Sequence, residues 1–338
     1  MLLIIFLDYR KVDVSIKILS IIMFAECIIV VVFDIVAFIQ HPGAAYGGFG
    51  LAMPHFTDPE AQFGVSMNYI FGTFFGFEGT IIYREEVRNP GKTIPRATIA
   101  TVLFIGLFYG IATWAFIAFY GADNVQNVAL ENIESLFETS MVALFGRIIM
   151  DVIMIMVLFS MFASTLSIVN ISSRYLYSLG KDGVLPKVLG RVHPKHASPY
   201  TAVLTVGGIY TLAVILLGIF GMEPITVYPR VSGIGTFGIM LIICIASIAI
   251  VAYFRKNPLE KPSVFSTLIA PIIAIFGVCL CTYFALINYG DLIGGGPILS
   301  GVFLSLTVAM FIIGVTYACV LKKNDIETYK NIGRQRGL

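Results

Sequence analysis

A glutamate flanked by glycines lies in the middle of the most unusual apolar stretch of this sequence. The stretch covers residues 68–96 and contains Gly72, Gly76, Gly79 and Glu78. An uninterrupted helix has no need of three glycines, and an ionised carboxylate at mid-membrane depth is costly enough to indicate a functional site. The pattern therefore predicts a broken helix at a binding site. The alternative is that Gly72 and Gly76, in GxxxG spacing, only let a neighbouring helix approach closely.

Two further acids, Glu26 and Asp34, lie inside an apolar run. Packing needs no acid at position 26, so Glu26 is a second candidate for titration; the alternative is snorkelling, or an interhelical hydrogen bond as a neutral acid. For Asp34, near the end of the run, that structural alternative is favoured. Arg147 and Asp151 are four residues apart near a helix start and are interpreted as a structural pair.

A row of hydroxyl and amide side chains lines the apolar run that follows residue 141. Ser164 and Ser167 are the candidates for lining a cavity, although hydroxyls in helices also bond back to their own helix. The row consists of Ser160, Ser164, Thr165, Ser167, Asn170, Ser172 and Ser173.

Side chains of the kinds that enzymes and metal sites use are not grouped in this sequence. The five cysteines all lie in apolar runs, where they behave as small hydrophobes. His193 and His196 lie in a basic loop without acid or cysteine partners in metal-ligand spacing, and the common hydrolase, metallopeptidase and nucleotide-binding motifs are absent. We expect no enzymatic activity, no metal or other cofactor, and no nucleic-acid partner.

Composition indicates a membrane protein. The chain has 338 residues, of which 58% are hydrophobic and 12% charged, with a mean hydropathy of +0.90. Those values exclude the water-soluble globular class. Continuous apolar runs of about 20 residues recur, which is the length that crosses a hydrocarbon core of about 30 Å, whereas a β-barrel needs shorter alternating segments. The sequence predicts one all-α polytopic domain embedded in the lipid bilayer.

Eight spans are predicted, after a stub over residues 1–12. Thr93 is expected to cap the third span with Pro95 in its first turn, and residues 122–140 are expected to form a short surface helix. The spans are 13–40, 63–83 (broken), 94–120, 141–179, 200–220, 231–254, 264–288 and 297–321, followed by a tail at 322–338.

Basic residues are distributed very unevenly between the two sides that these spans define. Of the 22 Lys and Arg, all except Arg147 and Arg230 fall on one side. Because basic residues are retained in the cytoplasm, the distribution predicts a multi-pass protein of the cell membrane with both termini cytoplasmic.

The chain resembles the amino acid, polyamine and organocation (APC) superfamily of secondary transporters at two motifs, FFGFEGTIIYREEVRNPGKTIPRATI and NISSRYLYSLGKDGVLPKVLGRVHP. The similarity covers essentially the whole chain. It implies an inverted-repeat fold that holds substrate between two broken helices. The eight spans then correspond to the family's helices 5 to 12, so we expect a truncated or partial transporter that does not transport by itself.

The resemblance also implies roles for the candidate residues. Carbonyl groups freed in the broken helix would accept hydrogen bonds from a substrate ammonium, and the Phe rings would add cation–π attraction, unless those rings only pack. Glu78, helped by Glu26, would couple transport to protons, with another cation possible, and Ser164 and Ser167 would lie near the family's ion or amine site. The candidate substrate-binding residues are Gly72, Thr73, Phe74, Phe75, Gly76 and Phe77.

The expected function is therefore secondary active transport of amino acids, coupled to protons. A different class stays open, namely a non-transporting membrane sensor or an inactive remnant built on a transporter scaffold.

Overall fold

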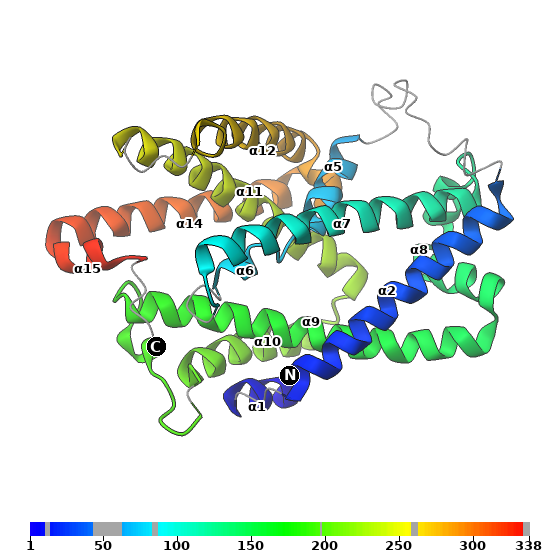
Figure 1. The fold of residues 1–338 in the computed structure, drawn as a ribbon, viewed down its shortest axis with the longest axis horizontal. Coiled ribbons are helices and arrows are strands. Elements are labelled where there is room, and N and C mark those ends of the chain that lie inside the picture. The colour runs from blue at the N-terminus through cyan, green and yellow to red at the C-terminus, as the bar shows by residue number, and fades with distance from the viewer. Residues whose placement is uncertain (11–13, 43–62, 83–86, 197, 258–262, 334–338) are drawn as a thin grey trace. The chain divides into compact units, whose positions relative to one another are not determined.

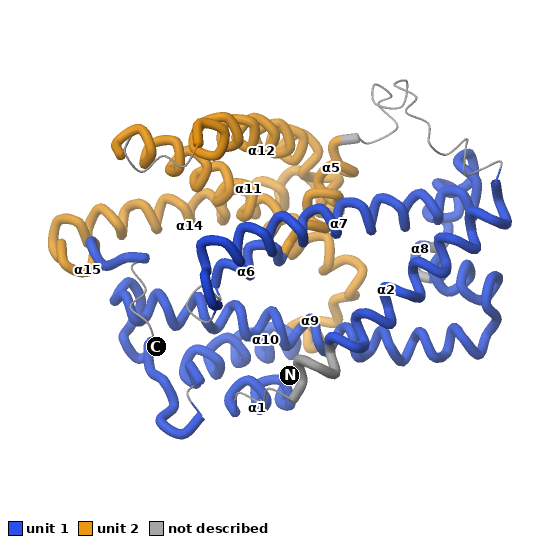
Figure 2. The backbone as a smooth tube through the Cα atoms, in the orientation of Figure 1, with its two compact units in different colours: residues 1–51, 76–215, 330–338 blue, residues 52–75, 216–329 orange. Residues whose placement is uncertain are grey.

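The computed structural model describes residues 1–10, 14–42, 63–82, 87–196, 198–257 and 263–333. Within those ranges all regular structure is helical (Figure 1). The chain divides into two compact units (Figure 2): unit 1 comprises residues 1–51, 76–215 and 330–338, and unit 2 comprises residues 52–75 and 216–329. The predicted all-α class is confirmed.

Unit 1 is built around α2, α7, α8 and α9. Its largest core cluster joins Phe33 and Ala37 of α2 to Ala115, Met141 and Met150. A second cluster packs Ile4 of α1 against Leu166 and Val169 of α9 and Val206 of α10. The elements are α1 (Leu2–Arg10), α2 (Val14–Gln40), α6 (Gly79–Ile82), α7 (Pro90–Tyr120), α8 (Val125–Phe145), α9 (Arg147–Lys181), the 3-10 helix η2 (Lys187–Gly190) and most of α10 (Tyr200–Ile219).

Unit 2 is built around the antiparallel neighbours α11 and α12. Met240 of α11 packs against Val278 and Ala285 of α12, and Phe237 packs against Tyr289 of α13. The elements are α5 (Phe63–Thr73), α11 (Pro224–Lys256), the π-helix η4 (Phe265–Ile269), α12 (Ala270–Ile287), α13 (Tyr289–Ile293), α14 (Pro297–Asn324) and most of α15 (Ile326–Asn331).

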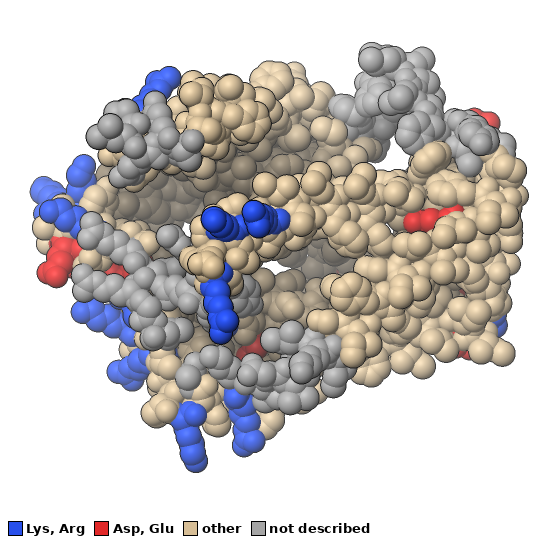
Figure 3. All heavy atoms as spheres, viewed as in Figure 1, with Lys and Arg blue, Asp and Glu red and all other residues tan. Residues whose placement is uncertain are grey.

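Seven helices in the described part of the chain are long and apolar enough to cross a membrane. Their outward side chains are apolar and remain uncovered, as with Ile148 (82% exposed) and Ile298 (86% exposed). Most of the surface seen in Figure 3 accordingly carries no charged side chain. A surface of this kind is stable only in a lipid environment, so the protein is a multi-pass membrane protein. The eighth expected span is the broken segment, which α5 and α6 form between them.

The third span begins earlier than its sequence suggested. α7 begins at Pro90, directly after Asn89, whose φ of 54° lies in the left-handed region. Thr93 is therefore inside the first turn and does not cap the helix; its hydroxyl donates to the Arg88 carbonyl at 3.0 Å. The reason is that proline fits the first helical position, where no backbone donor is needed, and asparagine tolerates positive φ better than most residues.

The boundary between the predicted surface helix and the fourth span also differs. α8 continues through the apolar residues 141–145, and Gly146, with a φ of 80°, separates it from α9, which begins at Arg147 rather than at Met141. Ser140 and Met141 are fully buried, so the end of α8 packs in the core of unit 1 and does not lie on the surface. Apolar residues on both sides of Gly146 made the two helices look like one run.

Candidate substrate and proton site

The helix predicted over residues 63–83 is interrupted. α5 ends at Thr73, α6 begins at Gly79, and residues 74–78 form turns. Gly76 has a φ of +103°, a conformation that side chains with a Cβ rarely adopt. A Cβ added at Gly76 would meet nothing within 4 Å, so the backbone conformation rather than a close neighbour requires glycine there. The interruption therefore lies where the glycine pattern places it.

The interruption leaves backbone acceptors unused. The N–H groups of Phe74 and Phe75 bond only three residues back, to the carbonyls of Phe71 and Gly72, each at 3.2 Å. Among the described residues, no donor is hydrogen-bonded to the carbonyl oxygens of Thr73, Phe74 or Phe75. A continuous helix would have satisfied these oxygens internally. They are consequently available to a ligand with hydrogens to donate.

Glu78 is part of the turn that follows. Its Oε2 accepts a hydrogen bond of 3.0 Å from the N–H of Gly76, and its side chain is half-buried. The hydroxyl of Thr80 donates to the Phe77 carbonyl at 2.9 Å and lies 2.7 Å from the hydroxyl of Thr98 on α7. Since the Thr80 hydrogen is used on Phe77, the Thr98 hydroxyl is the donor to Thr80. The carboxylate of Glu78 thus holds the turn, and α6 is tied to α7.

One face of α9 lies against α6. Gly79 is buried, and a Cβ there would lie 3.0 Å from Cδ1 of Ile171 on α9. Ser164 and Ser167 precede Ile171 by seven and four residues, so they lie on the same face of α9. Both serines are exposed, and within the described chain neither hydroxyl is hydrogen-bonded, whereas Thr165 bonds back to its own helix at 2.8 Å. The two predicted serines are therefore free to meet a ligand.

Glu26 contacts the same face of α9 one turn before Ser164. Its Oε2 accepts a 2.9 Å hydrogen bond from the hydroxyl of Ser160, and its Oε1 is buried without a partner in the described residues. Ser160 and Ile171 are eleven residues apart, which is about 16 Å along a helix. Glu26 and Gly79, the residue after Glu78, therefore contact one face of α9 at two separate places. Sequence reasoning named Ser160 only as a member of the hydroxyl row and missed it as the partner of Glu26.

The structure also describes the other polar candidates. Arg147 bonds to Asp151 at 3.0 Å and also to Glu138 at 2.7 Å, and all three side chains are exposed. His193 and His196 lie in the loop before α10 with ring centroids 4.7 Å apart. The described residues contain no group of three metal-ligating side chains.

Curated relatives of this chain are membrane transporters. It is 25% identical to the branched-chain amino acid permease BcaP of Bacillus subtilis over 227 residues, which are 65% of this chain and 44% of the relative. It is 23% identical to the methylthioribose transporter of the same organism over 70% of this chain and 49% of the relative. It is 29% identical to the low-affinity putrescine importer PlaP of Escherichia coli K12 over 42% of this chain and 31% of the relative.

The chain spans less than half the length of each of these relatives. No solved structure matches it. A sequence model of the family described as "Amino acid permease" matches residues 1–321, which is nearly the whole chain. Together with the interrupted helix and the seven apolar helices, this match shows that the chain belongs to the amino acid permease family.

Proposed function

We propose that this chain is part of a secondary transporter that carries amino acids across the cell membrane and that the interruption at residues 74–78 contacts the substrate. The observation that carries the proposal is the set of unused carbonyl oxygens at Thr73, Phe74 and Phe75. Carbonyl groups in an unwound membrane helix are suited to coordinating a cationic group, and the α-ammonium of an amino acid is such a group. The rings of Phe74 and Phe75 are half-buried and add cation–π attraction.

The substrate class is proposed from the same segment and from the relatives. The names of these relatives refer to branched-chain amino acids, methylthioribose and putrescine, so the family relationship alone does not select a substrate. Three Phe side chains in residues 74–77 favour an apolar partner over a charged one. A neutral amino acid with an apolar side chain fits both the carbonyl oxygens and the rings.

Proton coupling is proposed to act through Glu78. As a carboxylate, Glu78 accepts the hydrogen bond from the Gly76 N–H, and protonation weakens that bond because a neutral acid is a poorer acceptor. Loosening the turn changes the hydrogen-bonding geometry of the neighbouring carbonyl groups. Glu26 contributes separately, through its hydrogen bond with Ser160. Ser164 and Ser167 follow Ser160 on the same face of α9, before the residue that contacts α6, and their hydroxyl groups would serve as ligands for a second cation.

The test measures binding and transport with the same protein. Binding of radiolabelled leucine to the purified protein in lipid nanodiscs, with putrescine and methylthioribose as competitors, should be saturable and displaced by apolar amino acids. Uptake into proteoliposomes should be absent for this chain by itself, and it should rise with an inward proton gradient once the family's first four helices are supplied. Failure of every amino acid tested to bind saturably would contradict the proposal.

The role of Glu78 is tested by Glu78→Gln. Gln keeps the shape of the side chain but cannot change its protonation, so in a protein with the family's first four helices supplied we expect substrate exchange to persist in part while uptake loses its pH dependence. Glu131→Gln, at an exposed acid of α8, is the matched control and should leave the pH profile unchanged. A Glu78→Gln protein with the wild-type pH profile removes Glu78 from the coupling mechanism.

A further inference from the structure

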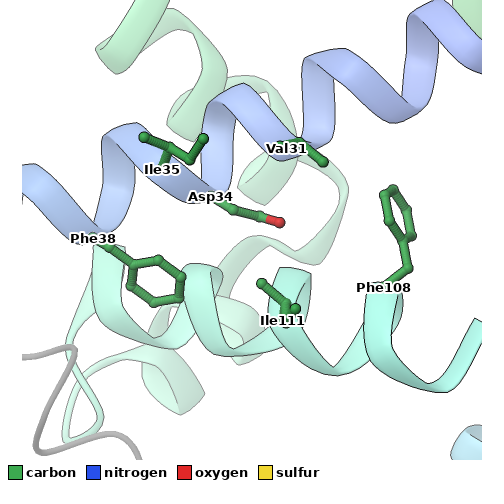
Figure 4. A pocket seen from close by; sticks show the side chains of 6 residues that line it. All are labelled: Val31, Asp34, Ile35, Phe38, Phe108 and Ile111. Atoms are coloured by element: carbon green, nitrogen blue, oxygen red, sulfur yellow. The ribbon is translucent and has the colours of Figure 1, made fainter. Parts of the chain in front are cut away.

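The second acid of α2 is buried in a different place from Glu26. Asp34 is only 4% exposed, and its Oδ1 is buried without a hydrogen-bond partner in the described residues. Figure 4 shows its carboxyl group directed into the space between α2 and α7. Both helices belong to unit 1. Within the described residues no hydrogen bond to this carboxyl group is seen, so the interhelical hydrogen bond that the sequence suggested for Asp34 is not found there.

A pocket of about 170 Å³ lies in front of this carboxyl group. Apart from Asp34, every side chain that lines it is apolar, and two of them are aromatic rings (Figure 4). The lining residues are Val31, Asp34, Ile35 and Phe38 of α2 and Phe108 and Ile111 of α7.

The chemistry of the lining selects a cation. A carboxyl group that stays ionised when it is buried needs a compensating charge or hydrogen bonds, and within the described residues Asp34 has neither a salt bridge nor a hydrogen bond. An ammonium group supplies both the charge and the donors. Phe38 and Phe108 line the same pocket, and aromatic rings attract cations.

The size of the pocket limits the rest of the ligand. An apolar protein cavity of about 150 Å³ accommodates a benzene molecule, so about 170 Å³ accommodates one ring or a branched aliphatic group of similar size.

We propose that the pocket between α2 and α7 is a binding site for a small organic ammonium ion with a compact apolar body, with Asp34 as its counter-ion. None of the residues that line this pocket belongs to the interruption at residues 74–78. Asp34 is also separated from Glu26, since it follows Glu26 by eight residues, which is about 12 Å along α2. It is thus a second ligand site in this protein, and its existence does not depend on the proposed transport function.

The test uses benzylammonium and its neutral analogue benzyl alcohol as probes. Binding to the full chain in phosphatidylcholine nanodiscs is measured by ligand-observed NMR, with empty nanodiscs subtracted to remove partition into lipid. The wild-type protein should bind benzylammonium saturably and at least tenfold more tightly than benzyl alcohol. Absence of saturable binding, or equal affinity for the two probes, overturns the proposal without requiring any variant to fold.

Variants then assign the binding to the pocket. Asp34→Asn should weaken benzylammonium binding at least tenfold and leave benzyl alcohol binding unchanged, since only the counter-charge is removed. Phe108→Leu should weaken benzylammonium binding severalfold through loss of the aromatic face. Asp123→Asn, at an exposed acid before α8, is the matched control and should have no effect. Unchanged affinity in Asp34→Asn, or an equal loss in Asp123→Asn, overturns the assignment.

Discussion

The hydroxyl of Ser160 donates a hydrogen bond of 2.9 Å to Oε2 of Glu26 and so joins two helices across 134 positions of sequence. The bond places Glu26 on the face of α9 that also carries Ser164 and Ser167 and that meets α6 at Ile171. The contact of Glu26 with Ser160 and the contact of α6 with Ile171 are about 16 Å apart along α9.

The first prediction concerns this hydrogen bond. Ser160→Ala removes the donor to Glu26, whose other oxygen is already without a partner, so unfolding free energy should fall by about 1–3 kcal/mol. The measurement is detergent-induced unfolding of the purified protein, followed by circular dichroism. Ser164→Ala, one turn further along the same face and without a hydrogen bond in the described chain, should change stability by less than about 0.5 kcal/mol. Equal losses for the two variants would show that the bond does not contribute.

The second prediction concerns the interruption itself. Gly76→Ala forces a side chain into a φ of +103° and should lower unfolding free energy by about 1–3 kcal/mol, although no neighbour would clash with the new methyl group. Gly110→Ala in the middle of α7 also meets no neighbour, but its helical backbone favours alanine, so it should be neutral or stabilising by up to about 1 kcal/mol. The same unfolding assay checks both. Changes of the same sign in the two variants would contradict the role given to the backbone of Gly76.

Hydropathy and glycine spacing were sufficient to predict the helical class and the place of the interruption. Both are local properties. An apolar run as long as a bilayer is thick predicts a membrane-spanning helix at the same residues, and a glycine suited to positive φ predicts a turn at its own position. Boundaries were less well predicted where apolar residues continue through a break. Residues 141–145 belong to α8 although they look like the start of α9, because only Gly146 separates the helices.

Pairings between distant residues were not predictable from this sequence. Nothing near Glu26 indicates that Ser160 is its partner, and nothing near Asp34 indicates that Phe108 lines the pocket in front of it. The sequence separated the two acids only by position, since Asp34 lies near the end of the apolar run. The packing of α2 against α9 on one side and α7 on the other distinguishes them, and that packing is a property of the whole of unit 1.

The third prediction concerns the docking of α1. A Cβ on Gly207 of α10 would lie 2.4 Å from Cγ1 and 2.7 Å from Cδ1 of Ile5, so Gly207→Ala should destabilise the protein by about 1–3 kcal/mol through overpacking. Gly208→Ala, at the next position and with no neighbour within 4 Å, is the matched control. Ile5→Ala combined with Gly207→Ala should recover part of the loss, because it removes both atoms that clash. Additive losses in the double variant would mean that α1 does not pack on α10 in this way.

The last prediction concerns the orientation of the chain. Four long apolar helices, α10, α11, α12 and α14, lie between Lys181 and Lys323, so we expect these two residues on the same side of the membrane. A single long helix, α9, separates Lys181 from Glu131 of α8, so we expect Glu131 on the opposite side. Basic residues are retained in the cytoplasm, and Lys181 and Lys323 belong to basic segments whereas Glu131 lies in an acidic one.

In a variant with all five cysteines replaced by alanine, Lys181→Cys and Lys323→Cys should react with a membrane-impermeant maleimide only after cells are permeabilised, and Glu131→Cys should react in intact cells. Labelling of Lys181→Cys and Lys323→Cys from opposite sides would show that one of the four helices does not cross, and labelling of both in intact cells would reverse the orientation.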